Sequence, residues 1–266
     1  GGLLGYGENH PFTYWLDKFL ERDIRRKADG VITTSTALYK MARKIGIPQE
    51  RLRHIPQGAD TEGVKPLPKT ECRKELNITL DAKVVELVTS GRSEETNLIL
   101  EFFRDVAREV ENSLLIFVGP KDPARQEIIK RYRLDEKVIE TGIIPHYKIG
   151  KYLALADVLV LPLPDNPNNQ VRGPIKLGDY MAAGRPILMA VKGDAADLIL
   201  KAGAGICCAP ENPEEIANAV LSLFTMSRRE RKELGKKGRD FYISQLSLQH
   251  GVTRFEEVLK YIAQYD

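Results

Sequence analysis

The feature that most constrains this chain is a regular alternation of short apolar segments and amphipathic segments along residues 84–226. Each apolar segment is bounded by Gly or Pro, and each is followed by a segment with helical periodicity. The apolar segments are residues 84–91, 113–119, 137–142, 157–163, 186–191 and 205–209. Continuous apolar strands that alternate with helices are typical of a parallel sheet with helices on both faces. We therefore predict an α/β fold with a doubly wound parallel sheet.

The N-terminal part repeats the same alternation on a smaller scale. Residues 13–30 have an amphipathic, basic pattern that predicts a helix, and residues 30–35 form a short β-branched strand segment. Ser35 is suited to cap a following helix, which Gly46 ends. Residues 51–58 are one more strand segment that runs into a Gly turn. This part predicts a second, partial α/β domain.

A Pro-rich connection, KPLPKTE, separates the two parts and is typical of a domain boundary. The expected division is a remnant of one domain with its linker (1–65), a complete α/β domain (66–245), and a C-terminal helix that packs back toward the N-terminal part (246–266). The chain begins without Met, and we expect it to be a piece of a longer protein.

Composition excludes several classes of protein. The formal charge of the 266-residue chain is only +3, so nucleic acid is not an expected partner. No apolar run approaches the roughly 20 residues of a membrane span. An odd number of cysteines fits no disulfide framework, which favours a reducing, cytoplasmic location. The four histidines lack ligand spacing, so we expect no metal. They are His10, His54, His146 and His250, and the cysteines are Cys72, Cys207 and Cys208.

Polar and Gly residues gather directly after four of the predicted strands, at residues 90–92, 118–120, 141–146 and 162–174. The carboxyl ends of parallel strands meet at one edge of a sheet, where open α/β folds bind ligands. Gly, Arg, Asn and Pro at four such ends predict a site for an anionic ligand with a flat moiety. Ordinary turn chemistry accounts for the same residue types and stays open as an alternative.

Several ordered segments resemble the retaining glycosyltransferases with the GT-B fold, of the group 1 (GT4) type. The segments are KADGVITTSTALYKMARKIGIPQERLRHIPQGADTEGVKPLP, GRSEETNLILEFF, residues 114–163 and KLGDYMAAGRPIL. The resemblance implies a Rossmann-like C-terminal domain that binds a nucleotide-sugar donor. In the family, the acceptor-binding half is much longer than the part of this chain that precedes Lys65. The resemblance therefore also implies that most of that half is absent here. The implied reaction transfers a hexosyl group to a hydroxyl acceptor in glycan, polysaccharide or glycolipid synthesis.

The turn after the first strand of the larger domain carries the first candidate residues. Gly91 permits close backbone approach, and Arg92 offers a guanidinium fork for a diphosphate. The resemblance implies that Arg92 contacts the donor pyrophosphate and stabilises the leaving diphosphate. A surface Arg at a turn is the alternative. The family usually has a Lys shortly after this Arg, whereas this chain has Glu94 and Glu95 there.

The segment from Arg172 to Asp179 carries the second group. Pro174 suits the first position of a helix beginning near Gly173, whose N–H groups can hold a phosphate. Lys176 and Asp179 share a helix face, and a simple ion pair is the alternative. Arg172 and Lys176 are expected to supply the positive charge missing beside Arg92. The resemblance implies that Asp179 accepts hydrogen bonds from the ribose hydroxyls.

The resemblance also assigns a loop to the nucleotide base. Backbone groups at Gly142 and apolar atoms of Ile143 and Ile144 would read and cover the base, and Gly119 would approach the donor. We predict Arg92 and Lys176 as catalytic residues and no cofactor beyond the donor substrate. The expected partners are the donor and a carbohydrate or lipid-linked acceptor. The basic helices further predict peripheral attachment at the inner face of the membrane.

Two rival functions stay open from the sequence. A non-catalytic nucleotide-sugar-binding scaffold is favoured by the acidic residues after Arg92 and by Val171, which stands where the family has a second carboxylate. A GT-B sugar-nucleotide epimerase is the other rival. The sugar, the base, the acceptor and the oligomeric state are not specified by the sequence.

Overall fold

The computed structural model describes residues 23, 25, 27–91 and 95–264, which divide into two compact units. One unit combines the segments Gly1–Pro56 and Gly251–Asp266, and the other is Gln57–His250. Each unit is described by itself. The predicted helix over 13–30 lies largely outside the described residues.

The smaller unit has a two-stranded parallel sheet with Val31 opposite Leu52. Its elements are β1 (Val31–Thr33), α2 (Thr36–Lys44), the 3-10 turn η1 (Gln49–Arg51) and β2 (Leu52–His54). The Ser35 hydroxyl accepts a hydrogen bond from the backbone N–H of Leu38 at 3.1 Å, which confirms the predicted helix cap. The guanidinium of Arg53 lies 5.6 Å from the ring centre of Tyr261, in the C-terminal helix α12 (Leu248–Ile262).

The larger unit contains a six-stranded sheet in the order β5-β4-β3-β6-β7-β8, with every pair parallel. The strands are β3 (Lys83–Val88), β4 (Ser113–Val118), β5 (Val138–Glu140), β6 (Val158–Pro162), β7 (Ile187–Ala190) and β8 (Gly205–Cys208). The prediction of a doubly wound parallel sheet is confirmed. Strand order reverses between β3 and β6, and in this fold ligands bind beside that switch point.

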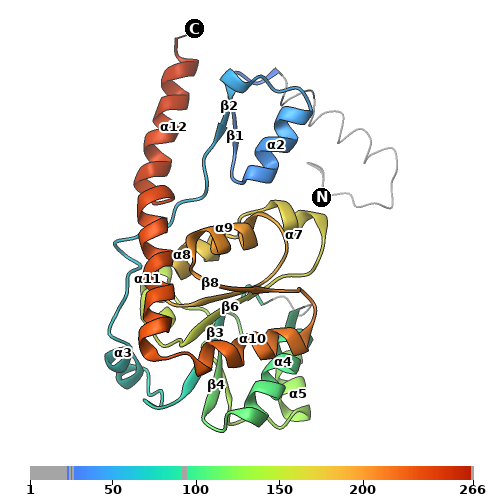
Figure 1. Ribbon diagram of the computed structural model, residues 1–266, viewed down its shortest axis with the longest axis vertical. Coiled ribbons are helices and arrows are strands. Elements are labelled where there is room, and N and C mark those ends of the chain that lie inside the picture. Colours follow the sequence, from blue (N-terminus) through green and yellow to red (C-terminus); the bar gives the residue numbers. More distant parts are fainter. Residues whose placement is uncertain (1–22, 24, 26, 92–94, 265–266) are drawn as a thin grey trace. The chain divides into compact units, whose positions relative to one another are not determined.

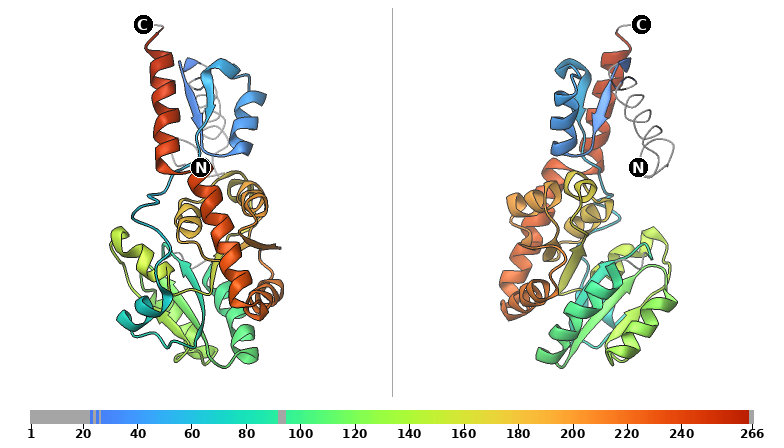
Figure 2. Two further views of the ribbon diagram at one scale, coloured as in Figure 1. Left: turned by 60° about the vertical axis from the view of Figure 1, so that its left-hand side comes forward. Right: turned by 90° about the vertical axis from the view of Figure 1, so that its right-hand side faces the viewer.

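Helices cover both faces of the sheet (Figures 1 and 2). They are α3 (Lys69–Glu75), α4 (Thr96–Glu109), α5 (Pro123–Arg131), the 3-10 turn η3 (His146–Lys148), α6 (Ile149–Leu153), α7 (Pro167–Val171), α8 (Ile175–Ala182), α9 (Asp194–Ala202), α10 (Pro213–Thr225) and α11 (Arg228–Gln245). Alternate residues of β3 belong to different cores: Val85 packs with α4 and α10, whereas Val84 packs with α6, α8 and α9. The sheet therefore separates two apolar layers.

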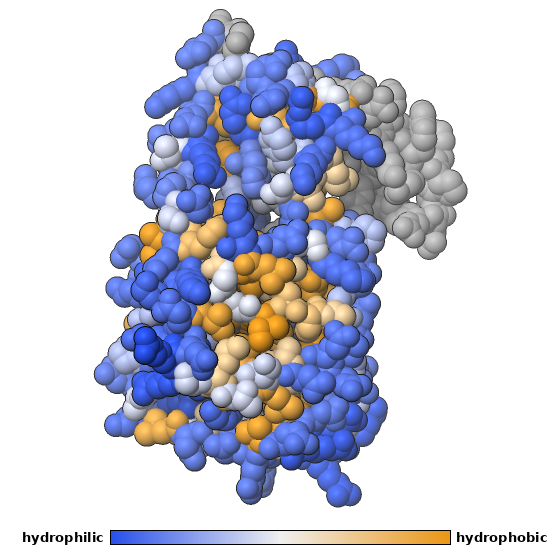
Figure 3. Space-filling model, viewed as in Figure 1, coloured by the Kyte–Doolittle hydropathy of each residue, from blue (hydrophilic) through white to orange (hydrophobic). Residues whose placement is uncertain are grey.

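Strand β8 is an edge of this sheet, because among the described strands it is hydrogen-bonded only to β7. Its four residues are half-buried rather than fully buried. Figure 3 shows apolar side chains gathered at the middle of the displayed face, over β8 and α9. The apolar segment 205–209 thus forms a strand, as predicted, but at the rim of the core.

Two short helices occur where the sequence predicted only Pro-rich connections. Helix α3 occupies part of the segment expected to link the domains, and α7 lies in the loop after β6. The Asn166 side chain caps α7 by accepting from the Asn169 backbone N–H at 2.9 Å, and Pro167 is its first residue. An Asn followed by Pro is a recognised helix start. This local signal was present in the sequence.

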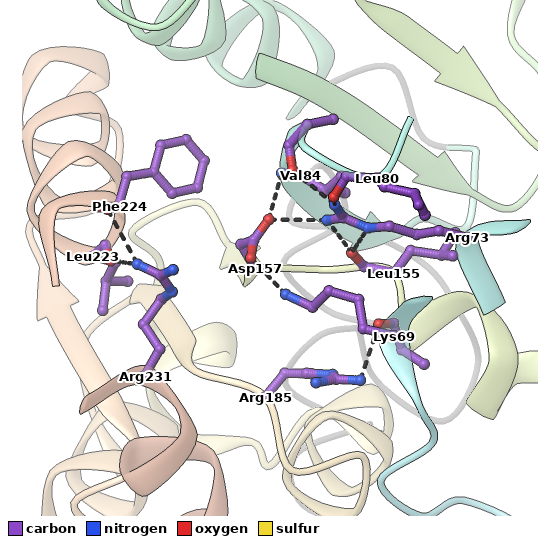
Figure 4. Close-up of polar contacts among 12 residues, drawn as sticks. Lys69, Arg73, Leu80, Val84, Leu155, Asp157, Arg185, Leu223, Phe224 and Arg231 are labelled. Atoms are coloured by element: carbon purple, nitrogen blue, oxygen red, sulfur yellow. Dashed lines mark hydrogen bonds and ion pairs between the residues drawn. The ribbon is translucent and has the colours of Figure 1, made fainter. Parts of the chain in front are cut away.

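A buried ionic network holds α3 against the start of β6 (Figure 4). Asp157 accepts from Lys69, from the guanidinium of Arg73 at 2.9 Å and from the Val84 backbone N–H at 3.0 Å. Arg73 also donates to the Leu155 carbonyl at 2.7 Å, and its side chain is only 3% exposed. Burial opposes ionisation of Asp157, but Lys69 and the hydrogen bonds hold its pKa below the ordinary value. The network is fully paired, as buried charges require.

Glu86 is an exception to that pairing. It lies in the middle of β3 and is fully buried, and neither carboxyl oxygen has a hydrogen-bond partner among the described residues. Burial raises its pKa well above the ordinary value, although the positive charges of Arg185 and Arg73 oppose the shift. The folded protein therefore keeps Glu86 protonated at a pH where the unfolded chain ionises it.

Replacing Glu86 by Gln is expected to make the folding stability less dependent on pH. A folded-state pKa above the unfolded value stabilises the fold at low pH, and this contribution is lost as pH rises from the unfolded pKa toward the folded one. The variant should gain stability over the parent as pH rises above the unfolded-state pKa of Glu86, by at most about 1.4 kcal/mol per pH unit. Urea unfolding at several pH values checks this, and equal pH slopes would contradict it.

Candidate functional site

Three turns meet at the carboxyl edge of the sheet. Gly119, directly after β4, pairs with Gly142, after β5, in an isolated antiparallel bridge. The Gly119 backbone N–H also donates to the Thr141 hydroxyl at 3.3 Å. The turn after β3 adjoins them, since a Cβ on Gly91 would lie 3.2 Å from the Pro120 side chain. The structure thus brings together the predicted residues Gly91, Gly119 and Gly142.

The absence of a side chain at Gly119 has a structural cause within this edge. Its φ is +142°, and a Cβ there would lie 2.2 Å from the Thr89 carbonyl oxygen. Any other residue would force the turns after β3 and β4 apart. The glycine is therefore explained by its neighbouring turn, and its approach to a donor stays a prediction.

Helix α8 starts beside these turns, one residue later than predicted. Pro174 is extended, with φ −64° and ψ 129°, and occupies the cap position rather than the first helical position. The expectation that Pro174 is the first helical residue is therefore wrong, because its backbone is still extended. Pro174, the cap residue, makes no side-chain hydrogen bond to the first turn of α8. The backbone N–H groups of α8 are oriented toward the carboxyl edge, where they favour negative charge.

Lys176 lies at the end of β3, where its ammonium donates to the Val88 carbonyl at 3.0 Å. Burial lowers the pKa of Lys176, Glu95 opposes this shift, and the positive charge of Arg172 adds to it. Lys176 and Arg172 are therefore within electrostatic range of each other, and Arg172 is exposed. Glu95 lies near enough to Lys176 to compete with an incoming anion for that cation. The two predicted phosphate-binding cations thus share one corner of the edge.

Tyr180 fixes α8 to the switch point of the sheet. Its hydroxyl accepts from the Val88 backbone N–H at 2.7 Å and donates to the Val160 carbonyl at 3.4 Å, so it joins β3 and β6. Burial raises its pKa. Its hydrogen bonds also fix the position of the neighbouring Asp179 along the sheet edge.

Asp179 is nearly buried and contacts a histidine that the sequence did not connect with it. The His146 Nε2 atom lies 3.2 Å from an Asp179 carboxylate oxygen, and the Asp179 side chain is 12% exposed. Burial raises the pKa of Asp179, and His146 opposes the shift. Asp60 lies near enough to affect both residues electrostatically. His146 is 69% exposed, as expected for a surface residue, yet it belongs to this cluster.

The loop between β5 and η3 presents an apolar side chain to solvent at the same edge. Ile143 is 82% exposed, whereas Ile144 packs partly against the core. An exposed Ile beside Gly142 is available to cover a flat ring. Arg92 lies outside the described residues, and the next described residue is Glu95.

The edge therefore combines two kinds of chemistry. Lys176, Arg172 and the first N–H groups of α8 attract an anion such as a phosphate. Asp179 offers a carboxylate able to accept from two hydroxyl groups. Within the described residues, no cluster of three His, Cys, Asp or Glu side chains is suited to a metal ion. In the same part of the chain, no helix has the length and apolarity needed to cross a membrane.

Comparison with known families agrees with this fold. The model of the family "Glycosyl transferases group 1" matches residues 85–226, more than half of the chain. The chain belongs to this glycosyltransferase family. The match runs from within β3 to the end of α10, and so includes all the turns of the carboxyl edge.

Among curated relatives, the chain is 24% identical over 176 residues to TuaH of Bacillus subtilis (strain 168), described as a putative teichuronic acid biosynthesis glycosyltransferase. The match covers 64% of this chain and 42% of TuaH. Among solved structures, sucrose-phosphate synthase from Thermosynechococcus elongatus has a TM-score of 0.79 at 21% identity, covering 95% of this chain and 63% of that one. The chain thus spans less than two thirds of either protein.

A second solved structure, HepE of Anabaena in complex with UDP and glucose, has a TM-score of 0.74 at 17% identity. The match covers 94% of this chain and 68% of HepE. These likenesses establish the GT-B glycosyltransferase fold.

Proposed function

We propose that this chain is the donor-binding portion of a retaining glycosyltransferase of the GT4 type. The reaction moves a hexosyl group from a nucleotide-diphosphate sugar to a hydroxyl acceptor. The observation that carries the proposal is the position of Lys176 and Asp179 on α8, beside the switch point between β3 and β6. Doubly wound folds bind nucleotides at this point.

The cationic corner would hold the diphosphate. Lys176 donates to the Val88 carbonyl at the end of β3, and Arg172 lies within electrostatic range of Lys176. The cap residue of α8, Pro174, makes no side-chain hydrogen bond to the first turn. Arg92 would act from the turn after Gly91. As the sugar–phosphate bond breaks, negative charge grows on the departing diphosphate, and these groups stabilise it before any rearrangement. No side chain of this chain is proposed as the nucleophile or general base.

Asp179 would orient the nucleoside. Its carboxylate accepts from the ribose hydroxyls, while the partly exposed His146 holds one carboxylate oxygen in place. Gly142 and Ile143 would read and cover the base. Complexes of neighbouring folds with UDP and glucose support a nucleotide-sugar ligand for this edge.

The proposal also covers the acceptor, the need for a cofactor and the location of the enzyme. The acceptor is a carbohydrate or a lipid-linked glycan, and it binds the half of the enzyme that precedes this chain's larger unit. The reaction needs no metal or other cofactor because Lys and Arg side chains neutralise the leaving group. The enzyme works in the cytoplasm, with peripheral attachment to the inner face of the membrane.

A non-catalytic nucleotide-sugar-binding subunit is the second candidate. Glu95 lies within electrostatic range of Lys176, and Val171 offers no second carboxylate for the sugar. Both features would lower the affinity for a nucleotide-sugar donor below that of a chain with the usual family residues. Transfer of sugar from the donor to an acceptor glycan separates an enzyme from a subunit that only binds.

Nucleotide binding tests the proposal. UDP, GDP or ADP is expected to raise the melting temperature of the chain, because a ligand that binds only the folded state stabilises it by mass action. Replacing both Arg172 and Lys176 by Ala should weaken that nucleotide's affinity at least about tenfold, since hydrogen bonds to charged groups contribute most to such contacts. Isothermal titration calorimetry measures the change.

The matched control removes two exposed cations from α11, as Arg229→Ala with Lys232→Ala. It carries the same change in net charge and should bind the nucleotide like the parent. Unchanged affinity in the Arg172→Ala/Lys176→Ala protein would show that the diphosphate is held elsewhere. If the parent binds none of the three nucleotides, the donor-binding proposal fails.

A further inference from the structure

A second basic hollow lies away from the proposed donor site, where α4 and α5 end and the chain enters β5. It has a volume of about 350 Å³. Its lining residues are Arg104, Ala107, Arg108, Arg131, Tyr132, Arg133, Leu134 and Lys137. In Figure 1, α4 and α5 lie next to each other beside β4. Five of these eight residues are cationic, so the hollow attracts anions.

The cations of this hollow are only partly neutralised. Asp105 pairs with Arg104 at 2.9 Å and with Arg108 at 3.2 Å. Among the described residues, no ion pair neutralises Arg131 or Arg133. A single carboxylate therefore forms ion pairs with this group of cations. Like charges held this close oppose folding unless a bound anion offsets them.

Helix ends explain some of these cations but not all. Arg108 and Arg131 occupy the last turns of α4 and α5, where positive charge interacts favourably with the helix dipole. Lys137 donates to the Ala107 carbonyl at 3.5 Å, close to the end of α4. Arg133 lies beyond the end of α5, so its presence needs another explanation.

The backbone at Arg133 is in the left-handed region, with φ +55°. Its N–H donates to the Lys130 carbonyl, and the Leu134 N–H donates to the Ile129 carbonyl, both at 3.0 Å. These two bonds define a Schellman motif, which favours Gly or Asn at this position. Other helices followed by a left-handed residue include α2, α3 and α8, which have Gly46, Asn77 and Gly184 there. An Arg at α5 is thus less favourable for the backbone, and its side chain lines the hollow.

We propose that this hollow binds a small soluble ligand that carries two or more phosphate groups. Guanidinium groups bind phosphate oxygens in pairs, and five cations exceed what a single phosphate would neutralise. The volume is near the lower limit of about 300 Å³ for small-molecule sites, which favours a compact ligand over a polymer. The site is separate from the donor site and does not depend on the proposed function.

Inorganic pyrophosphate is the probe, titrated by calorimetry into the Arg172→Ala/Lys176→Ala chain, in which binding at the proposed donor site is weakened. Replacing Arg133 by Gly in that background should weaken pyrophosphate binding about tenfold. The same change should raise the melting temperature, because Gly relieves the left-handed backbone. The Arg133→Gly chain should therefore melt at a higher temperature and bind pyrophosphate more weakly. General damage to the fold cannot produce this combination.

Two matched controls separate charge from backbone effects. Lys130→Ala removes an exposed cation of α5 that does not line the hollow, and should leave the affinity unchanged. Asn77→Gly changes a left-handed residue at another helix end without altering charge, and should also leave it unchanged. The proposal is overturned if pyrophosphate does not bind, or if it binds the Arg133→Gly chain as tightly as the chain that keeps Arg133.

Vesicles distinguish a soluble ligand from a lipid headgroup. Phosphatidylglycerol–phosphatidylcholine vesicles are compared with phosphatidylcholine vesicles in a flotation assay. The proposal expects no difference between the parent and the Arg133→Gly chain. Vesicle binding that depends on Arg133, without pyrophosphate binding, would overturn the proposal and favour a membrane.

Discussion

Replacing Asp179 by Asn is expected to weaken nucleotide-diphosphate binding roughly 10- to 100-fold. The nearly buried carboxylate accepts from two ribose hydroxyls in the proposed complex, whereas an amide presents one acceptor and one donor. Hydrogen bonds to a charged acceptor are the stronger kind, particularly where water is largely excluded. Isothermal titration calorimetry with the nucleotide that most stabilises the parent measures the loss.

The matched control for this change is Asp240→Asn. Asp240 is 58% exposed and pairs with Lys236 on α11, far along the chain from the turns of the site. This variant loses the same charge and should bind the nucleotide like the parent. Equal affinity of the Asp179→Asn and parent proteins would show that Asp179 does not contact the nucleotide.

Replacing Asp157 by Ala is expected to cost about 3–5 kcal/mol of the free energy of unfolding. The change leaves the buried guanidinium of Arg73 and the ammonium of Lys69 without their carboxylate. It also removes the acceptor for the Val84 backbone N–H. Unpaired buried charges cost far more than the lost attraction between exposed ions. Urea unfolding, followed by circular dichroism, measures the difference.

An exposed ion pair provides the comparison for this stability effect. Asp240→Ala breaks the pair with Lys236 and should change the free energy of unfolding by less than about 1 kcal/mol. If Asp157→Ala prevents folding, Asp157→Asn keeps an acceptor for Val84 and should unfold at an intermediate urea concentration. Losses of similar size at Asp157 and Asp240 would contradict the role assigned to the buried network.

The sheet was predictable because its strands have strong local signals. Apolar segments such as 113–119 and 157–163 lie between Gly or Pro residues and helical periodicity, and each became a strand at nearly the predicted limits. The same alternation predicted parallel pairing, since a helix between two strands returns the chain to the same edge. The gathering of Gly91, Gly119 and Gly142 followed from that topology.

Other features depend on contacts between distant residues and left little trace in the local sequence. His146 and Asp179 are 33 positions apart, and only the loop after β5 brings them together. Glu86 interrupts an apolar strand, but its burial without a hydrogen-bond partner among the described residues depends on packing from both faces. Helix α3 was missed because its Pro-rich approach favoured a linker, whereas its ionic contacts with Asp157 stabilise it in the fold.

The central claim is that Asp179 faces the ribose of a nucleotide held at the carboxyl edge of the sheet. A double cycle tests it most directly, with the parent and Asp179→Asn chains each titrated with the nucleotide diphosphate and its 2′,3′-dideoxy analogue. The proposal predicts that removing the ribose hydroxyls weakens binding to the parent at least about tenfold but hardly affects the variant. Equal losses in both proteins would contradict contact between Asp179 and the ribose.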